Sequence, residues 1–138
     1  IYNKQRVDFL SSLKDSSQSH DIIVGGMVTR KEYIKELCQS EYVFSPFGWG
    51  EICYRDFEAV LSNSVLIKPN MDHIDTFPNI YVKGAYVPVE WNLSNLEEAI
   101  QLVQKESNRK EFHSFASNIL MESFDFTKIK KHLKDQFE

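Results

Sequence analysis

Residues 42–69 read YVFSPFGWGEICYRDFEAVLSNSVLIKP. An apolar run at the start of this stretch (YVF) stops at a Ser-Pro pair and is followed by a loop with two glycines. A helical pattern over about residues 53–62 comes next, and a second, continuous apolar run, residues 65–68, lies near its end. Continuous apolar runs are typical of strands that are buried on both faces of a parallel sheet. The stretch therefore predicts two parallel strands joined by a helix, the basic unit of an α/β fold.

The rest of the chain adds further helices and strands to this unit. Apolar residues at helical spacing predict helices over about residues 2–14, 30–39, 94–103, 109–120 and 127–137. Short apolar runs predict strands at 21–24 and 86–89, whereas the strand-like run 80–82 is too short to join the main sheet. Thr29 and Glu32 have the spacing of a capping box, and Pro88 indicates an edge strand or a strand end. We expect a Rossmann-like, three-layer α/β domain with a mostly parallel sheet of about four or five strands and C-terminal helices.

Length and composition favour one globular domain over residues 1–138. The net charge is −4, with 42% hydrophobic and 26% charged residues. An acidic balance argues against a nucleic-acid partner, because such proteins usually carry a basic field. Two cysteines are too few for a disulfide framework or a zinc site. Because a helix precedes the first predicted strand, we expect a piece of a longer protein whose first strand lies upstream.

The loop after the first strand of the quoted stretch has the composition of a phosphate site. Ligands of open α/β sheets bind at the carboxyl ends of the strands. Gly48 and Gly50 allow close approach of the backbone and a positive φ, and the next helix offers free N–H groups at its start. Arg55 can hold a phosphate in two hydrogen bonds, and Glu58, with Glu51 before it, can accept hydrogen bonds from a ribose diol. The alternative is a structural glycine turn followed by a surface ion pair.

Three motifs in this region resemble a known family. They are Ser40-x-Tyr42-Val43-Phe44-x-Pro46-x-Gly48, Arg55-x-x-Glu58-Ala59 and Ser64-Val65-Leu66-Ile67. Together they resemble the donor-binding, C-terminal half of GT-B glycosyltransferases, including exostosin-like enzymes and related bacterial polysaccharide glycosyltransferases. The resemblance extends from about Arg6 to Leu102 and is strongest over residues 40–70.

This resemblance implies a nucleotide-sugar donor and transfer of its sugar to a carbohydrate or lipid-linked acceptor. It implies that Glu58 binds the ribose and that Arg55 helps to hold the diphosphate, which makes them the candidate catalytic residues. It also implies an N-terminal domain in the same chain that carries the acceptor, with no metal or cofactor beyond the donor. Retaining enzymes of this fold have two glutamates eight positions apart, whereas here Gly50 lies eight positions before Glu58 and Glu51 is the nearest carboxylate.

Several other residues are candidates for the same site. Lys68 follows the second strand at the same sheet edge, where it either neutralises phosphate or is solvated. Phe47 and Trp49 either stack on a base or sugar or pack over the loop, and His73 lies either near the donor sugar or in an exposed loop. The full set of predicted donor-binding residues is Gly48, Trp49, Gly50, Glu51, Arg55, Glu58 and Lys68.

Two other functions remain as alternatives: a receiver-like α/β binding module and a structural interaction domain. A receiver needs acidic residues after its first strand, which DIIV at residues 21–24 does not provide at its carboxyl end. The C-terminal segment contains four lysines, Lys128, Lys130, Lys131 and Lys134. They predict a solvated helix face, with contact to an anionic membrane as the less favoured alternative. The sequence assigns no compartment.

Overall fold

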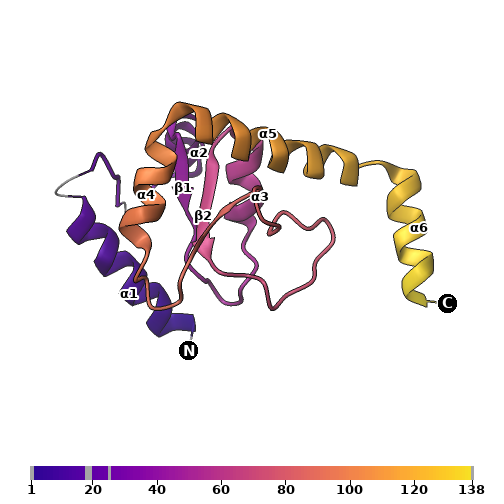
Figure 1. Cartoon of the computed structure of the whole chain (residues 1–138), viewed down its shortest axis with the longest axis horizontal. Coiled ribbons are helices and arrows are strands. Elements are labelled where there is room, and N and C mark those ends of the chain that lie inside the picture. The colour runs from indigo at the N-terminus through magenta and orange to yellow at the C-terminus, as the bar shows by residue number, and fades with distance from the viewer. Residues whose placement is uncertain (1, 18–19, 25, 138) are drawn as a thin grey trace.

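A computed structural model of the chain describes residues 2–17, 20–24 and 26–137, and within them three parallel strands form one sheet (Figure 1). The strands are β1 (Tyr42–Phe44), β2 (Val65–Pro69) and β3 (Val87–Val89), in the order β1-β2-β3. Val43 pairs with Leu66, and Ile67 pairs with Val87. The α/β class and the parallel sheet are confirmed, but the described residues contain fewer strands than expected.

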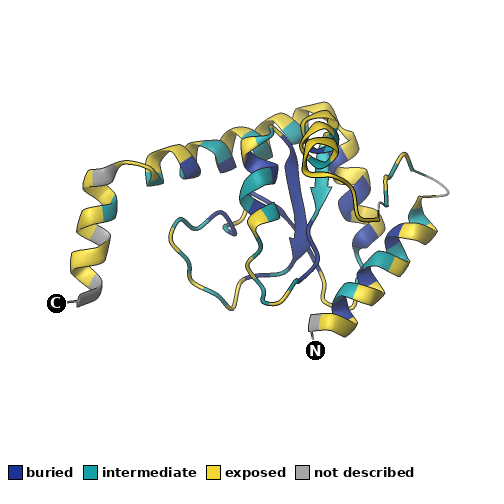
Figure 2. Cartoon of the chain, turned by 180° about the vertical axis from the view of Figure 1, so that it is seen from behind, coloured by how far each residue is buried: buried dark blue, intermediate teal, exposed yellow. Residues whose placement is uncertain are grey.

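Helices cover both faces of the sheet. One hydrophobic cluster joins the sheet to α1 (Tyr2–Ser16) and α4 (Leu96–Gln104). A second cluster joins the other face to α3 (Tyr54–Leu61) and α5 (Glu106–Ser123). β2 lies between these layers and is buried along its whole length (Figure 2). The continuous apolar run of β2 is thus explained by burial on both faces.

Alternation along β2 decides which side chains face α3. Val65 and Ile67 belong to the cluster with α1 and α4, and Leu66 belongs to the cluster with α3 and α5. Successive side chains of a strand point to opposite faces, so Lys68 points to the same face as Leu66. The strand therefore directs one lysine toward α3, into the interior of the domain.

Local signals place the helices close to their predicted positions. α2 (Arg30–Gln39) begins with the predicted capping box, because Thr29 N–H donates to Glu32 Oε2 at 2.9 Å and Glu32 N–H donates to Thr29 Oγ1 at 3.3 Å. α3 is followed by Asn63, whose φ of 68° is a left-handed conformation that asparagine tolerates better than most residues. Pro88 lies in the edge strand β3, where its missing N–H is tolerated.

One predicted strand is wrong, and one strand-like run forms no strand. Residues 21–24 pair with no strand among the described residues, although Ile22 and Val24 pack against the cluster of α1 and α4. Ile23 between them is 73% exposed. The segment therefore has the alternating burial of a strand but lacks hydrogen bonds to a neighbouring strand. Residues 80–82 also form no strand: Ile80 and Tyr81 are buried in the loop between β2 and β3. A run of this length indicates burial but does not distinguish a strand from a packed loop.

The C-terminal helices extend beyond the sheet. α5 runs past the sheet, and α6 (Phe126–Phe137) lies at its far end, away from the strands (Figures 1 and 2). Its four lysines are exposed. None of the helices in the described part of the chain is both long and apolar enough to cross a membrane.

Candidate functional site

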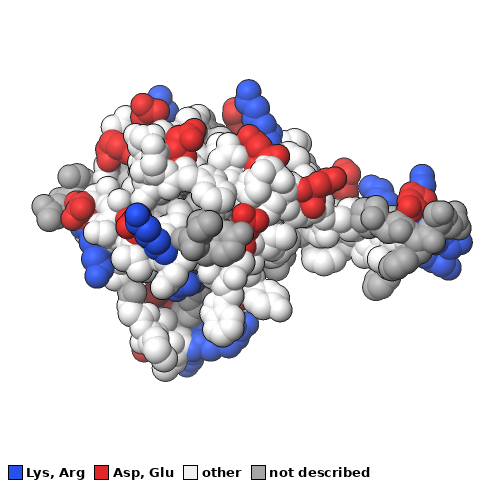
Figure 3. All heavy atoms as spheres, turned by 90° about the horizontal axis from the view of Figure 1, so that it is seen from below, with Lys and Arg blue, Asp and Glu red and all other residues white. Residues whose placement is uncertain are grey.

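The loops that follow the three strands lie on one side of the domain. In Figure 3, which looks onto that side, most of the surface is uncharged, and acidic and basic side chains are scattered over it. Residues 45–53 follow β1, residues 70–86 follow β2 and residues 90–95 follow β3. This edge of a parallel sheet is where open α/β proteins bind ligands. The candidate site is therefore built from these loops and the start of α3.

A buried network around Asp56 fixes the first of these loops. Asp56 is the third residue of α3, and its carboxylate accepts hydrogen bonds from Ser45 Oγ, from Cys53 N–H at 3.0 Å and from Tyr81 OH at 2.7 Å. Lys68 Nζ lies 3.1 Å from Asp56 Oδ2, and both side chains are fully buried. The network ties both ends of loop 45–53 to β2 and to the following loop.

Burial makes this network hard to break. A buried charge is costly unless it is paired and hydrogen-bonded, and here the carboxylate meets one cation and three other donors. Burial, followed by the nearby charge of Asp56 and its hydrogen bond, raises the pKa of Tyr81 well above its usual range. Tyr81 thus stays a hydrogen-bond donor at ordinary pH. These buried contacts together hold loop 45–53 in one shape.

Of the two alternatives for Lys68, the solvated lysine is wrong, because its side chain is fully buried against Asp56. The phosphate role stays a prediction. Its ammonium also donates to the carbonyl of Ser45 at 3.3 Å and lies 5.3 Å from the centre of the Phe47 ring. Direct contact with a phosphate would require this pair to open. The structure therefore gives Lys68 the contacts of a residue that shapes the loop.

Of the two loop glycines, only Gly48 is needed for space, since a Cβ at Gly50 would meet nothing within 4 Å. Neither glycine uses the positive φ that its lack of a side chain allows. A Cβ at Gly48 would lie 3.3 Å from Cys53 Sγ, which is a tight contact. Gly48 N–H donates to the carbonyl of Gly50 at 3.0 Å, so this amide is already used within the loop. Trp49 between them is fully exposed and is not part of the packed interior.

Glu58 and Arg55 lie at the junction of α2 and α3. Tyr33 OH donates to Glu58 Oε2 at 2.6 Å, and Arg30 Nη2 lies 3.9 Å from Glu58 Oε1. The side chain of Glu58 is 30% exposed. Burial, together with the hydrogen bond and charge of Glu58, raises the pKa of Tyr33 to about 12, and the charge of Arg55 acts in the opposite direction. Glu58 is thus neither locked in the interior nor paired mainly with Arg55, and its ligand role stays a prediction.

A second carboxylate of the site, Glu51, pairs with a histidine from another loop. His73 Nε2 lies 2.9 Å from Glu51 Oε1, and the Glu51 side chain is only 17% exposed whereas that of His73 is 45% exposed. Trp91, from the loop after β3, packs edge-on against His73 with ring centres 5.5 Å apart and against Phe47 at 5.0 Å. The three loops therefore meet at one histidine.

Sequence reasoning named Arg55, Glu58, Glu51 and His73 as candidates but missed the partners of Glu58. Tyr33 and Arg30 come from a helix that the sequence places far from Glu58, and no local pattern joins them. The sequence did contain one signal that Asp56 is buried. A lysine inside a continuous apolar strand needs a buried partner of opposite charge. Asp56 is an acidic residue in the helix that precedes this strand.

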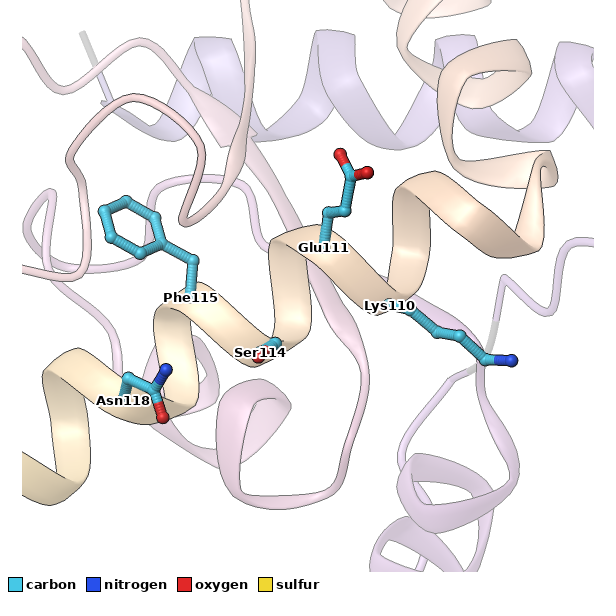
Figure 4. Close-up of a pocket in the computed structure, with 5 residues that line it drawn as sticks. All are labelled: Lys110, Glu111, Ser114, Phe115 and Asn118. Atoms are coloured by element: carbon cyan, nitrogen blue, oxygen red, sulfur yellow. The ribbon is translucent and has the colours of Figure 1, made fainter.

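A shallow hollow of about 500 Å³ lies along α5 and is lined by residues of that helix alone (Figure 4). They are Lys110, Glu111, Ser114, Phe115 and Asn118. Among the residues that the structure describes, no three histidine, cysteine, aspartate or glutamate side chains are grouped as metal ligands.

No known family model, curated protein or solved structure matches this chain. The resemblance to glycosyltransferases therefore stays a prediction from the motifs quoted above, and the proposal that follows depends on residues and geometry.

Proposed function

We propose that this chain is the donor-binding half of a Rossmann-like, GT-B-type glycosyltransferase. In this proposal the chain binds a nucleotide-sugar, and the whole enzyme transfers the sugar to a carbohydrate or lipid-linked acceptor. The observation that carries the proposal is the position of Glu58. It is a partly exposed carboxylate on α3, one helical turn from Arg55 and beside a loop held in shape by Asp56.

Each part of this arrangement suits one part of the donor. The diphosphate would lie against the start of α3, where the helix dipole and Arg55 favour negative charge. Glu58 would accept hydrogen bonds from the ribose hydroxyls and so position the reacting carbon. Because Tyr33 OH and Arg30 already approach Glu58, the ribose would enter an existing network of donors rather than meet a bare carboxylate.

Preorganisation of the loop is the physical basis of catalysis in this proposal. Groups that are fixed before the reaction stabilise developing charge without reorganising at the moment of reaction. The buried pair of Asp56 and Lys68 would serve this purpose indirectly, by holding loop 45–53 against α3. Arg55 would then stabilise the negative charge that builds on the departing nucleoside diphosphate. Trp49, which is fully exposed beside this loop, would be free to stack on the base or the sugar.

A nucleotide-binding panel tests the proposal. Calorimetric titration of the complete chain with UDP, GDP, CMP, UDP-glucose, GDP-mannose and CMP-sialic acid should give saturable binding for at least one nucleotide and its sugar conjugate. Inorganic phosphate alone should bind much more weakly, because it reaches none of the ribose contacts. If none of these six compounds binds, the proposed function is wrong.

A further inference from the structure

The pair formed by Glu51 and His73 differs from an ordinary surface ion pair. A carboxylate can only accept, so the hydrogen bond at 2.9 Å places the proton of the neutral imidazole on His73 Nε2. The other ring nitrogen, Nδ1, has no hydrogen-bond partner among the described residues, and in the neutral imidazole it is the nitrogen that carries the lone pair. Trp91 packs against the ring and limits its rotation. The result is a histidine that is held on one side and open on the other.

A second histidine of the chain provides a direct contrast. His20 Nε2 also lies 2.9 Å from a carboxylate oxygen, that of Glu97. Its Nδ1, however, is occupied by Gln104 Nε2 at 2.9 Å. His20 thus uses both nitrogens to join α4 to the segment after α1, which is a structural arrangement. His73 uses one nitrogen in the same way, but its other nitrogen has no partner among the described residues, and its side chain is 45% exposed.

The position of this pair brings it next to the predicted reaction centre. Glu51 lies in the loop that leads into α3, and Trp91 contacts both His73 and Phe47 of that loop, so the pair belongs to the same edge of the sheet as the start of α3. In the proposed mode of binding, a diphosphate at the start of α3 would direct its sugar toward this pair. A hydroxyl that attacks this carbon would approach from the open side of the pair.

We propose, on the basis of the function proposed above, that His73 is the general base for the attacking hydroxyl and that Glu51 is its positioning residue. The donor-binding half would then contain its own proton acceptor. The hydroxyl oxygen forms a bond to the anomeric carbon while its proton moves to His73 Nδ1. The bond from that carbon to the diphosphate oxygen breaks, and its electron pair leaves with the nucleoside diphosphate. The imidazolium pairs with Glu51 and later releases the proton to solvent.

The charges of the pair favour this direction of proton transfer. Before the reaction Glu51 and neutral His73 carry one net negative charge, and after proton transfer they carry none. The repulsion between the pair and the leaving diphosphate therefore falls as the reaction proceeds. A carboxylate that holds a histidine through its far nitrogen stabilises the imidazolium in the same way in other enzymes with general-base histidines.

Hydrolysis of a nucleotide-sugar by water tests this role without the natural acceptor. The complete chain is incubated with UDP-glucose and with GDP-mannose, and release of the nucleoside diphosphate is followed by phosphorus NMR. We expect His73→Ala to lower kcat by about 100-fold, the lower range for general-base catalysis. Its affinity for UDP or GDP should not change, and added imidazole should restore part of the rate. Glu51→Gln should lower kcat without changing KM, because glutamine accepts the hydrogen bond but does not balance the imidazolium.

The matched control is His20→Ala, which removes the other histidine–glutamate pair and should leave hydrolysis unchanged. Three results would each overturn the role of His73 while leaving nucleotide binding intact: hydrolysis by His73→Ala at the original rate, a loss that imidazole does not restore, or no hydrolysis by the unmodified chain that binds the donor. If the unmodified chain binds neither nucleotides nor nucleotide-sugars, the proposed function itself fails, and this inference fails with it.

Discussion

Two carboxylates of α3 make the same kind of contact in opposite surroundings. Asp56 Oδ2 accepts from Tyr81 OH at 2.7 Å, and Glu58 Oε2 accepts from Tyr33 OH at 2.6 Å. Residues two apart on a helix point to nearly opposite sides, so one carboxylate enters the interior and the other faces α2. Asp56 is fully buried with Lys68, whereas Glu58 is 30% exposed and only 3.9 Å from the exposed Arg30.

This difference separates a residue that stabilises the fold from one that is available to a ligand. Asp56 has a complete set of buried partners, and exchanging any of them for a ligand would expose an unpaired charge. Glu58 can exchange Tyr33 or Arg30 for another donor, because water reaches it and compensates the loss. Similar bond lengths therefore say little about function, and burial of the partners decides between the two roles.

Removal of Asp56 should give the largest effect on stability. Asp56→Ala leaves Lys68 buried without a counter-charge, which typically costs about 3–5 kcal/mol. Urea unfolding of the variant and of the unmodified chain measures the change. Adding Lys68→Met to Asp56→Ala should recover a large part of the loss, since an apolar side chain needs no partner. A cost for Asp56→Ala below about 1 kcal/mol, the range of exposed ion pairs, would contradict the structural role assigned to the pair.

Glu58→Ala should show the opposite balance of effects. We expect little change in the free energy of unfolding but a loss of about 1–3 kcal/mol in nucleotide binding, the range for hydrogen bonds to a charged group. Titration with the tightest-binding nucleotide of the panel measures the affinity. Glu98→Ala, which removes an exposed carboxylate of α4, is the control and should bind normally. Unchanged affinity in Glu58→Ala would show that Glu58 does not hold the ribose.

The same comparison shows how far the sequence could predict the molecule. The strand–helix–strand unit was predicted because its signals are local: apolar runs, a glycine loop and a turn at Asn63. Glu58 was found for the same reason, since it follows Arg55 by one helical turn. The inward position of Asp56 was missed because helical periodicity assigns a charged residue to the solvent face. The same rule assigns an apolar side chain to the inner face, yet Leu61 is 65% exposed.

Features that depend on distant segments could not be predicted from local patterns. Residues 21–24 have the alternation of a strand, yet a strand requires a neighbour to share its hydrogen bonds, and the pattern does not reveal whether one exists. The pairing of Glu51 with His73 joins two loops that are separated in the sequence by a helix and a strand. Only the parallel arrangement of β1 and β2 brings their carboxyl ends, and hence these loops, together.

The smallest predicted effect concerns Tyr33 and appears mainly at high pH. The pKa of Tyr33 is raised to about 12 in the folded chain from its usual 10.0, chiefly by burial and then by Glu58. Its contribution to stability is therefore fully present below about pH 10 and is lost as the pH rises through about 12, because the unfolded chain loses this proton first.

Tyr33→Phe should cost about 1 kcal/mol or less at neutral pH, the usual value for one hydrogen bond. Between pH 10 and 12, its free energy of unfolding should fall less steeply than that of the unmodified chain. Urea unfolding at pH 8, 10 and 11 measures both effects, and Tyr54→Phe, at an exposed tyrosine, is the matched control. Equal slopes for Tyr33→Phe and the unmodified chain would mean that Tyr33 is neither buried nor held by Glu58 in solution. The carboxylate would then be still more open to a ligand than its contact with Tyr33 indicates.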